Sequence, residues 1–332
     1  MVAQLDRPYV SFLRGRTLVR LLSYAAFEGR PLTTRGRWVN PLVQAHLAAG
    51  TRFPSTTVDR PIFVLGVGRS GTTLLGKLLG GHPHVGFLNE PKALWHAVRD
   101  DEDIIGTYSP TPGRLRLGAD DATPDVVSRA RRLFAYYAWV TRSKRVVDKY
   151  PELVFRHAFV RTIFPDARFV VITRDAPAVA ASITRWSQER GTADANWWGL
   201  NDRKWQTLWA EGVGASPELA PLANEVDPAT RDDRIRALVE WLLVAREALA
   251  IQAEPHVHLL RYEDLVADPP GALGQLLERL ELPRSTALEA FAAQEIRDTV
   301  GSGNVEGLPS VGPGLADELA AARSELGYSA VR

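Results

Sequence analysis

A strand that runs through a glycine-containing loop into a helix is the feature that most constrains this fold. The strand is the apolar run IFVLGV at 62–67, and the helix is TTLLGKLLGG, which closes with Gly80 and Gly81. An apolar run without alternation is typical of a strand buried on both faces, as in parallel sheets. Glycines are common just beyond the last turn of a helix. The unit therefore predicts a parallel sheet covered by helices.

Three more apolar runs predict buried strands, at 145–149 (RVVDK), 168–175 (RFVVITRD) and 257–265 (VHLLRYEDL). Helix-like stretches follow such runs, and the one after Asp175 has Pro177 in its first turn, where proline is favoured. Strands that alternate with helices predict an α/β fold with a P-loop-like parallel sheet and helices on both faces. Polar and tryptophan-rich segments between these units predict helical insertions.

Composition excludes several classes of function. The 332 residues carry a net charge of +1, which argues against a broad basic surface, so we expect no nucleic-acid partner. The chain has no cysteine, which excludes disulfides, thiolate nucleophiles and cysteine-bearing zinc sites. The chemistry must therefore come from other side chains.

The N-terminal residues have arginines scattered among apolar residues. They lack the unbroken apolar centre of a signal peptide and the long run of a membrane span, so we expect a cytoplasmic protein without a transmembrane segment. Leu18, Leu21, Leu22 and Ala25 recur at helical spacing and predict an amphipathic helix packed on the body of the protein. A helix that lies on a membrane surface is the alternative.

The loop of the first unit reads G-x-x-x-x-G-T-T from Gly66 to Thr73. In nucleotide triphosphatases the second glycine is followed by a lysine that contacts the β and γ phosphates. Here Thr72 takes the place of that lysine, and the positive charge lies at Arg69. The backbone N–H groups of such a loop and the start of the next helix still favour an anion. A turn that only joins strand to helix is the alternative.

The sequence has no clear magnesium-binding acid. RFVVITRD ends in Asp175, but Arg174 beside it would disfavour a bound magnesium ion, and the aspartate can equally cap the next helix. An anion site without the triphosphate lysine suits a nucleotide whose transferable group carries less charge than a γ-phosphate. A sulfuryl group meets that description.

Two joined motifs resemble those of sulfotransferases that use 3′-phosphoadenosine 5′-phosphosulfate (PAPS). GVGRSGTTLL is similar to their 5′-phosphosulfate loop, and VITRDAPAVAASITRW is similar to their 3′-phosphate segment. RYEDLVADP also resembles a segment of that family, so the resemblance spans roughly residues 60–270. It is closest to the tyrosylprotein and carbohydrate branches and their bacterial relatives. The resemblance implies the sulfotransferase fold, PAPS as donor and adenosine 3′,5′-bisphosphate (PAP) as product.

The resemblance also implies which residues hold the donor. Arg174 and the serine eight residues later, Ser182, correspond to the pair that binds the 3′-phosphate. Tyr262 either contacts the nucleotide or packs in the core. The family's C-terminal Arg-Lys-Gly motif is absent, so the glycine-rich loop at 299–314, which we expect to be mobile, is the candidate to complete the pocket. The residues implied to bind the 5′-phosphosulfate are Gly68, Arg69, Ser70, Gly71, Thr72 and Thr73.

Three residues are candidates for catalysis. Glu90, in HPHVGFLNEPKALW, stands where the similar branch has its base, and a carboxylate there can accept the proton of an attacking hydroxyl. Lys149, in DKYP, corresponds to a lysine that stabilises the transferring group. Arg69 suits stabilising the bridging oxygen, because its guanidinium offers several N–H donors. The alternative is that Glu90 is an acid in the first turn of a helix capped by Asn89. His96 is a weaker candidate base.

Two further groups of side chains have open roles. The H-x-H pairs at 82–84 and 256–258 supply only two ligands each, so we expect no metal. Five tryptophans follow the 3′-phosphate segment and either line an apolar acceptor cleft or fill the core. They are Trp186, Trp197, Trp198, Trp205 and Trp209.

The sequence thus predicts one sulfotransferase domain that moves a sulfuryl group from PAPS to a hydroxyl of a small molecule, lipid or glycan. A small-molecule kinase and an inactive nucleotide-binding module are the alternatives, and the Ala- and Arg-rich composition indicates a bacterial source. Over 1–332 we expect an N-terminal helical segment (about 1–58), a nucleotide-binding core (about 60–185 and 255–270), an acceptor-side helical insertion (about 186–252) and a C-terminal loop and helix (299–332).

Overall fold

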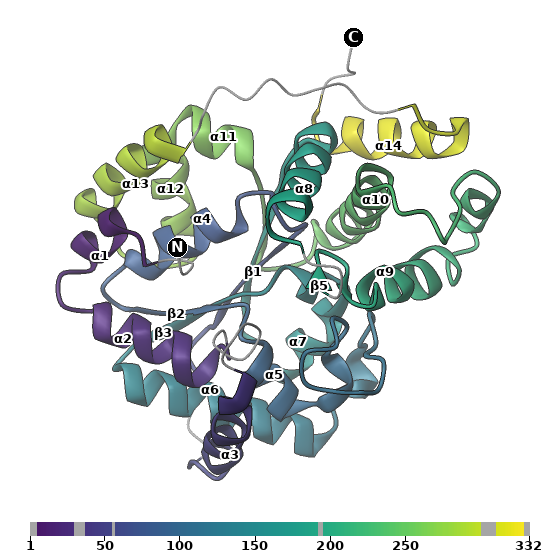
Figure 1. The fold of residues 1–332 in the computed structure, drawn as a ribbon. Helices are drawn as coiled ribbons and strands as arrows, with labels where there is room; N and C mark the ends of the chain where they lie inside the picture. The colour runs from purple at the N-terminus through teal and green to yellow at the C-terminus, as the bar shows by residue number, and fades with distance from the viewer. Residues whose placement is uncertain (1–4, 30–36, 55–56, 192–194, 300–309, 329–332) are drawn as a thin grey trace.

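The computed structural model describes residues 5–29, 37–54, 57–191, 195–299 and 310–328. Helices and strands alternate along much of the chain (Figure 1). The strands are β1 (Ile62–Gly66), β2 (Val85–Asn89), β3 (Arg145–Lys149), β4 (Arg168–Thr173), β5 (Ala195–Asn196), β6 (Gly199–Leu200) and β7 (Val257–Arg261). The α-helices are α1 (Arg7–Leu13), α2 (Thr17–Leu22), α3 (Asn40–Gly50), α4 (Thr72–Gly81), α5 (Lys92–Val98), α6 (Pro124–Thr141), α7 (His157–Ile163), α8 (Ala176–Arg190), α9 (Arg203–Thr207), α10 (Asp233–Ile251), α11 (Tyr262–Ala267), α12 (Pro269–Arg279), α13 (Thr286–Thr299) and α14 (Pro313–Glu325).

Five parallel strands form the central sheet in the order β2-β3-β1-β4-β7. This architecture confirms the predicted α/β fold. Four of the strands match predicted runs, although the run at 257–265 is a strand only as far as Arg261 and becomes helix α11 at Tyr262. The edge strand β2 is not among the predicted ones, because five residues between a His-Pro-His stretch and a proline give a weak local signal.

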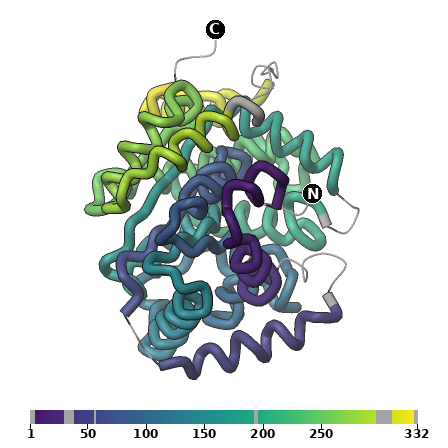
Figure 2. The backbone as a smooth tube through the Cα atoms, turned by 90° about the vertical axis from the view of Figure 1, so that its left-hand side faces the viewer, coloured from purple at the N-terminus to yellow at the C-terminus, as the bar shows by residue number. Residues whose placement is uncertain are grey.

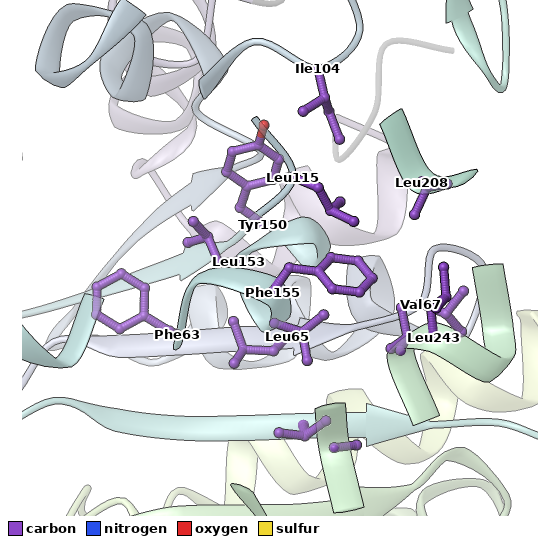
Figure 3. Close-up of a cluster of buried hydrophobic side chains, with 14 of the residues drawn as sticks. Phe63, Leu65, Val67, Ile104, Leu115, Tyr150, Leu153, Phe155, Leu208 and Leu243 are labelled. Carbon is purple, nitrogen blue, oxygen red and sulfur yellow. The ribbon is translucent and has the colours of Figure 1, made fainter. Parts of the chain in front are cut away.

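The central sheet separates two hydrophobic layers. From β1, Phe63 and Leu65 enter one cluster, whereas Ile62 and Val64 enter the other. This alternation follows from the pleat of a strand that is covered on both faces. Helices α6, α7, α8 and α10 supply the first layer, and α1, α4, α12 and α13 supply the second (Figures 1 and 2). Figure 3 shows part of the first cluster, including Phe155.

The N-terminal helix α2 packs with a face that differs from the predicted one. Leu18, Leu21 and Leu22 are 76%, 41% and 39% exposed, and Ala25 is exposed as well. The prediction that this stripe packs on the body of the protein is therefore wrong. The buried side of α2 instead carries Arg20.

Arg20 is buried because its charge is compensated. Its guanidinium forms an ion pair of 2.5 Å with Glu28 and lies 4.9 Å from the ring centroid of Phe87. A pattern of apolar residues assigns an arginine to the solvent-facing side of a helix. It therefore predicted that the opposite side of α2 is buried. Across the described ranges, every helix is too short or too polar to cross a membrane.

The segment 186–252 contributes to the main core. Helix α10 packs on α8 and buries Leu238 and Leu242 in the first cluster. Trp198 and Trp205 are also fully buried there. These two tryptophans therefore fill the core, which answers part of the question that the sequence left open.

Candidate functional site

The loop between β1 and α4 has the geometry of an anion cradle. Gly66 and Gly71 have φ values of 139° and 92°, in the region that favours glycine. A Cβ on Gly66 would lie 2.3 Å from the carbonyl oxygen of Ile172, and one on Gly71 would lie 2.4 Å from the ring of Tyr262. The curled backbone leads into α4 at Thr72, so the positive end of that helix faces the cradle.

The two arginines predicted to bind the donor, Arg69 and Arg174, meet at this loop. The Nε–H of Arg69 donates to the Oγ of Ser182 on α8 at 3.1 Å. The Nη1–H of Arg174, at the end of β4, donates to the carbonyl oxygen of Arg69 at 3.3 Å. The structure therefore brings together residues that are separated by more than one hundred positions in the sequence.

Three helices, α10, α11 and α14, contact Arg174 or its neighbour Asp175. Its guanidinium carbon lies 4.5 Å from the ring centroid of Tyr262 at the start of α11, and its carbonyl oxygen accepts from the Nε1–H of Trp241 at 2.8 Å. Asp175 caps α8, as the alternative interpretation of that acid predicted, and also accepts two hydrogen bonds from Arg323 of α14 at 2.7 and 3.1 Å.

The loop end of the site carries a surplus of positive charge. Within the described residues, neither Arg69 nor Arg174 lies at ion-pair distance from a carboxylate. Desolvation in the cleft, with the neighbouring guanidinium groups of Arg190 and Arg174, lowers the pKa of Arg69. Burial is the larger cause and the neighbouring cations add to it, and a bound anion would offset both effects.

Glu90 and Lys149 form an ion pair at the ends of β2 and β3. The Nζ of Lys149 donates to the Oε1 of Glu90 at 2.5 Å, and the backbone N–H of Glu90 donates to the carbonyl oxygen of Lys149 at 2.6 Å. The Lys149 side chain is 1% exposed and that of Glu90 is 24% exposed. Helix α5 begins at Lys92 with Pro91 as its cap, so the alternative interpretation, in which Asn89 caps this helix and Glu90 lies in its first turn, is wrong.

Glu90 interacts electrostatically with the loop, because the charge of its carboxylate acts to raise the pKa of Arg69. Both residues have positive φ values, 47° for Glu90 and 70° for Arg69. Non-glycine residues in this region of φ are uncommon and concentrate at functional sites.

A cleft of about 380 Å³ opens along the loop and the first turns of α4. It is lined by seven of the predicted donor-binding residues, namely Arg69, Gly71, Thr72, Thr73, Arg174, Ser182 and Tyr262. Of the other two, Gly68 packs on Trp197, whose ring would lie 2.4 Å from an added Cβ, and Ser70 is fully buried.

Four lining residues were not predicted, namely Leu74, Lys77, Asp6 and Glu295. Lys77 forms ion pairs with Asp6 at 2.8 Å and with Glu295. Lys77 lies one helical turn after Thr73, so its place on the same face of α4 follows from the sequence. Asp6 and Glu295 come from the two ends of the chain, and no local pattern indicates that they meet.

Two buried polar side chains, one just after β1 and one at the end of β2, have no hydrogen-bond partner for their side-chain atoms in the described part of the chain. They are Ser70, in the loop, and Asn89, which lies opposite Lys149 in the register of β2 and β3. Buried polar groups are normally satisfied, so an orphaned hydroxyl in an anion cradle fits a ligand that is bound there.

The histidines form no metal site in the described residues, where no group of three or more potential ligands is found. The ring of His82 hydrogen-bonds the carbonyl oxygen of Pro283 at 3.0 Å. His96 stacks on Tyr108, with ring centroids 5.2 Å apart. Most of the predicted loop at 299–314 lies outside the described residues.

The chain resembles known sulfotransferases and related proteins in sequence. Residues 61–221 match the model of the sulfotransferase family. The chain is 25% identical over 285 residues to the omega-hydroxy-beta-dihydromenaquinone-9 sulfotransferase Stf3 of Mycobacterium tuberculosis, covering 70% of this chain and 66% of that protein. It is 24% identical over 230 residues to the nodulation protein NoeE of Sinorhizobium fredii, covering 66% of this chain and 49% of that one.

Solved structures of two sulfotransferases align with this chain. The sulfotransferase STF1 from Mycobacterium tuberculosis H37Rv aligns with a TM-score of 0.48 and 18% identity, over 98% of this chain and 99% of that one. The sulfotransferase domain from the curacin biosynthetic pathway aligns with a TM-score of 0.48 and 16% identity, over 82% of this chain and 99% of that one.

Proposed function

We propose that this chain transfers a sulfuryl group from PAPS to a hydroxyl group, because its residues 61–221 match the model of the sulfotransferase family. The observation that carries this proposal is the cleft in which Arg69 and Arg174 converge without a carboxylate of the described residues to neutralise them. PAPS carries anionic groups on both sides of its ribose, so it offers each arginine a charged acceptor.

The residues of the cleft fit such a donor. The 5′-phosphosulfate would lie in the loop, against the backbone N–H groups at the start of α4 and the hydroxyls of Ser70, Thr72 and Thr73. The 3′-phosphate would lie between Arg174 and Ser182. PAPS supplies the sulfuryl group, and the protein supplies orientation, charge and a base.

The proposed step is an in-line displacement. The acceptor oxygen forms a bond to sulfur as the bond from sulfur to the 5′-phosphate oxygen breaks, and that oxygen keeps the bonding electrons. Glu90 accepts the proton of the attacking hydroxyl. Arg69 and Lys149 stabilise the negative charge on the departing phosphate and on the sulfuryl oxygens. The products are a sulfate ester, PAP and a protonated Glu90.

The contact between Lys149 and Glu90 supports these roles. An ammonium group at 2.5 Å favours the charged carboxylate, which is the form that accepts a proton. Lys149 lies beneath α4, since its Cβ would be 3.3 Å from a Cβ on Gly76. The lysine is therefore held between the base and the helix that begins at the donor loop.

The acceptor is proposed to be a hydroxyl of a lipid, glycan or small molecule. The relative Stf3 is named for an omega-hydroxylated menaquinone, which supports a lipid among these classes. The two alternatives stay testable. A kinase would need a charge to replace the lysine absent at Thr72, and an inactive module would bind PAP without transferring anything.

A transfer assay tests the proposal. The protein is incubated with PAPS and panels of hydroxyl-bearing lipids, glycans and small alcohols, and products are identified by a mass gain of one sulfate. We expect transfer that persists in a metal chelator and is lost with Glu90→Gln. Magnesium-dependent ATP turnover would identify a kinase instead, and PAP binding without any transfer would identify the inactive module.

A further inference from the structure

We propose that the surface formed by α2 and α3 docks the protein on an anionic lipid bilayer. We call this surface the N-terminal face and define it by five exposed apolar side chains, Leu18, Leu21, Leu22, Trp38 and Leu42. Trp38 lies in the 3-10 turn η2 (Arg37–Val39), directly before α3. This inference goes beyond sulfuryl transfer and does not depend on the identity of the donor.

The apolar side chains of the N-terminal face are unusually concentrated. Leu18, Trp38 and Leu42 are 76%, 79% and 66% exposed, and within the described residues the face holds five of the six exposed large hydrophobic side chains. Scattered exposed apolar residues are ordinary on soluble proteins, whereas a cluster of them marks an interaction site.

Helices α2 and α3 are linked by the π-helix η1 (Ser23–Phe27), which contacts both of them. This π-helix follows α2 directly, and its Phe27 packs edge-on against His46 of α3, with ring centroids 5.3 Å apart. Figures 1 and 2 both show α3 at the lower end of the molecule, with α2 above it. Helix α3 carries no charged residue, and its exposed side includes Pro41 and Ala45 as well as Leu42.

Charge identifies the kind of partner. Residues 1–58 contain eight arginines and two acids, a net charge of +6, whereas the rest of this +1 chain carries −5. Of the two acids, Glu28 is buried and paired with Arg20, and Asp6 is paired with Lys77. Arg7 and Arg14 are exposed at the start and end of α1. The N-terminal segment therefore presents leucines, a tryptophan and arginines, and both of its acids are paired with cations.

This combination fits the interface of a bilayer that contains anionic lipids. Leucine and tryptophan side chains enter the boundary between headgroups and acyl chains, and arginines are attracted to the negative surface. A second copy of the chain is a poorer partner, because symmetric pairing would place two faces of like charge together. Helix α2 has six residues and can only lie on the membrane.

The N-terminal face is attached to the strand that carries the candidate base. The Oε1 of Glu28 accepts from the backbone N–H of Asn89 at 2.8 Å, and Arg20 donates to the carbonyl oxygen of Phe87 at 3.1 Å. The N–H of Asn89 and the carbonyl oxygen of Phe87 both belong to β2, which ends one residue before Glu90. Docking through this face would therefore hold the end of β2 in a fixed relation to the lipid surface.

A vesicle flotation assay without nucleotide tests the proposal. The protein is mixed with vesicles of phosphatidylcholine alone or with about one third phosphatidylglycerol, and the bound fraction is measured at low and high salt. We expect binding to the anionic vesicles that weakens in high salt. Absence of binding to them, or equal binding to both compositions at both salt concentrations, would overturn the proposal.

Two matched pairs of variants assign the binding to the face. Leu18→Gln, Leu21→Gln and Leu22→Gln together should lower vesicle affinity by about tenfold or more, whereas Met at the same positions should preserve it. Arg14→Gln should lower it by about fivefold and Arg231→Gln, on an exposed arginine of the insertion, should not. Sedimentation measures self-association in the same samples. Unchanged binding by the Gln variant, or a dimer that this variant abolishes, would contradict the proposal.

Discussion

The ends of strands β1 and β4 differ from the ends of β2 and β3 in how their charges are balanced. At the first pair, Arg69 and Arg174 approach each other without a carboxylate at ion-pair distance in the described residues. At the second pair, Glu90 and Lys149 form an ion pair, and the lysine is almost completely buried. All four residues follow or end parallel strands, so they lie along one edge of the sheet.

The difference separates two tasks. A site with surplus cations gains most from a ligand that brings negative charge, because that charge replaces mutual repulsion by hydrogen bonds. In the ion pair of Glu90 and Lys149, a carboxylate that can accept a proton lies next to a cation, and the two charges nearly cancel. We therefore propose that the first region binds a doubly anionic donor and that the second region accepts the proton.

Glu90→Gln should give the largest effect, a loss of turnover without a loss of donor binding. The substitution removes the proton acceptor and keeps the size of the side chain, so turnover on a confirmed acceptor should fall by about 10³-fold. The affinity for PAP should change by less than about threefold, because the donor is held by the other region. Initial rates and calorimetry check the two expectations. Glu318→Gln on α14 is the matched control, and full turnover by the Glu90 variant would refute the base assignment.

The opposite result is expected for the arginines. Arg69→Gln and Arg174→Gln should each weaken PAP binding by about 30- to 100-fold, since each removes a charge-assisted contact from a desolvated cleft. Arg231→Gln, whose side chain is 82% exposed, should leave the affinity unchanged. Calorimetric titration measures all three. Wild-type affinity in both cleft variants would mean that the donor does not bind between these arginines.

The sequence predicts the binding region better than the proton-transfer region. The loop, Arg174 and Ser182 belong to contiguous motifs whose order fixes a strand, a turn and a helix, so local chemistry places them. The ion pair of Glu90 and Lys149 depends on β2, which gave no clear strand signal, and their roles came only from resemblance. Lys77, Asp6 and Glu295 meet through tertiary packing of three distant segments. The stripe on α2 was assigned to the wrong side because a paired, buried arginine has no apolar signature.

Gly71→Ala tests the shape of the binding region. Its backbone has a φ of 92°, and an added Cβ would meet the ring of Tyr262 at 2.4 Å. We expect a loss of about 1–3 kcal/mol in the free energy of unfolding and weaker PAP binding. Gly118→Ala is the control, because no atom lies within 4 Å of its added Cβ. Thermal and urea unfolding measure both, and equal stability of the two variants would contradict the described loop.

Asp148→Asn should have the smallest effect. This carboxyl is buried beside Lys149 and accepts the Nε1–H of Trp95 at 2.7 Å, and burial raises its pKa well above the ordinary value of 3.8. The group is therefore protonated in the folded protein at pH values where the unfolded chain has released the proton. Its contribution to stability is complete below 3.8 and is lost as the pH rises through the raised value.

Asparagine keeps the acceptor for Trp95 and cannot ionise. Below pH 3.8, where the wild-type carboxyl is protonated in both the folded and the unfolded state, the substitution should change the free energy of unfolding by less than about 1 kcal/mol. As the pH rises, the wild type should lose stability relative to the variant, which urea unfolding at several pH values measures. A difference that is constant with pH, or one that grows in favour of the wild type, would show that the carboxyl is charged in the fold.

The central claim is that the two arginines bind the two phosphate ends of one adenosine carrier. Isothermal titration of the protein with PAP, with adenosine 5′-monophosphate and with ATP plus magnesium tests it directly. We expect PAP to bind at least about tenfold more tightly than the monophosphate, and this preference to disappear in Arg174→Gln. Equal affinity for PAP and the monophosphate, or tighter binding of ATP with magnesium, would contradict the account.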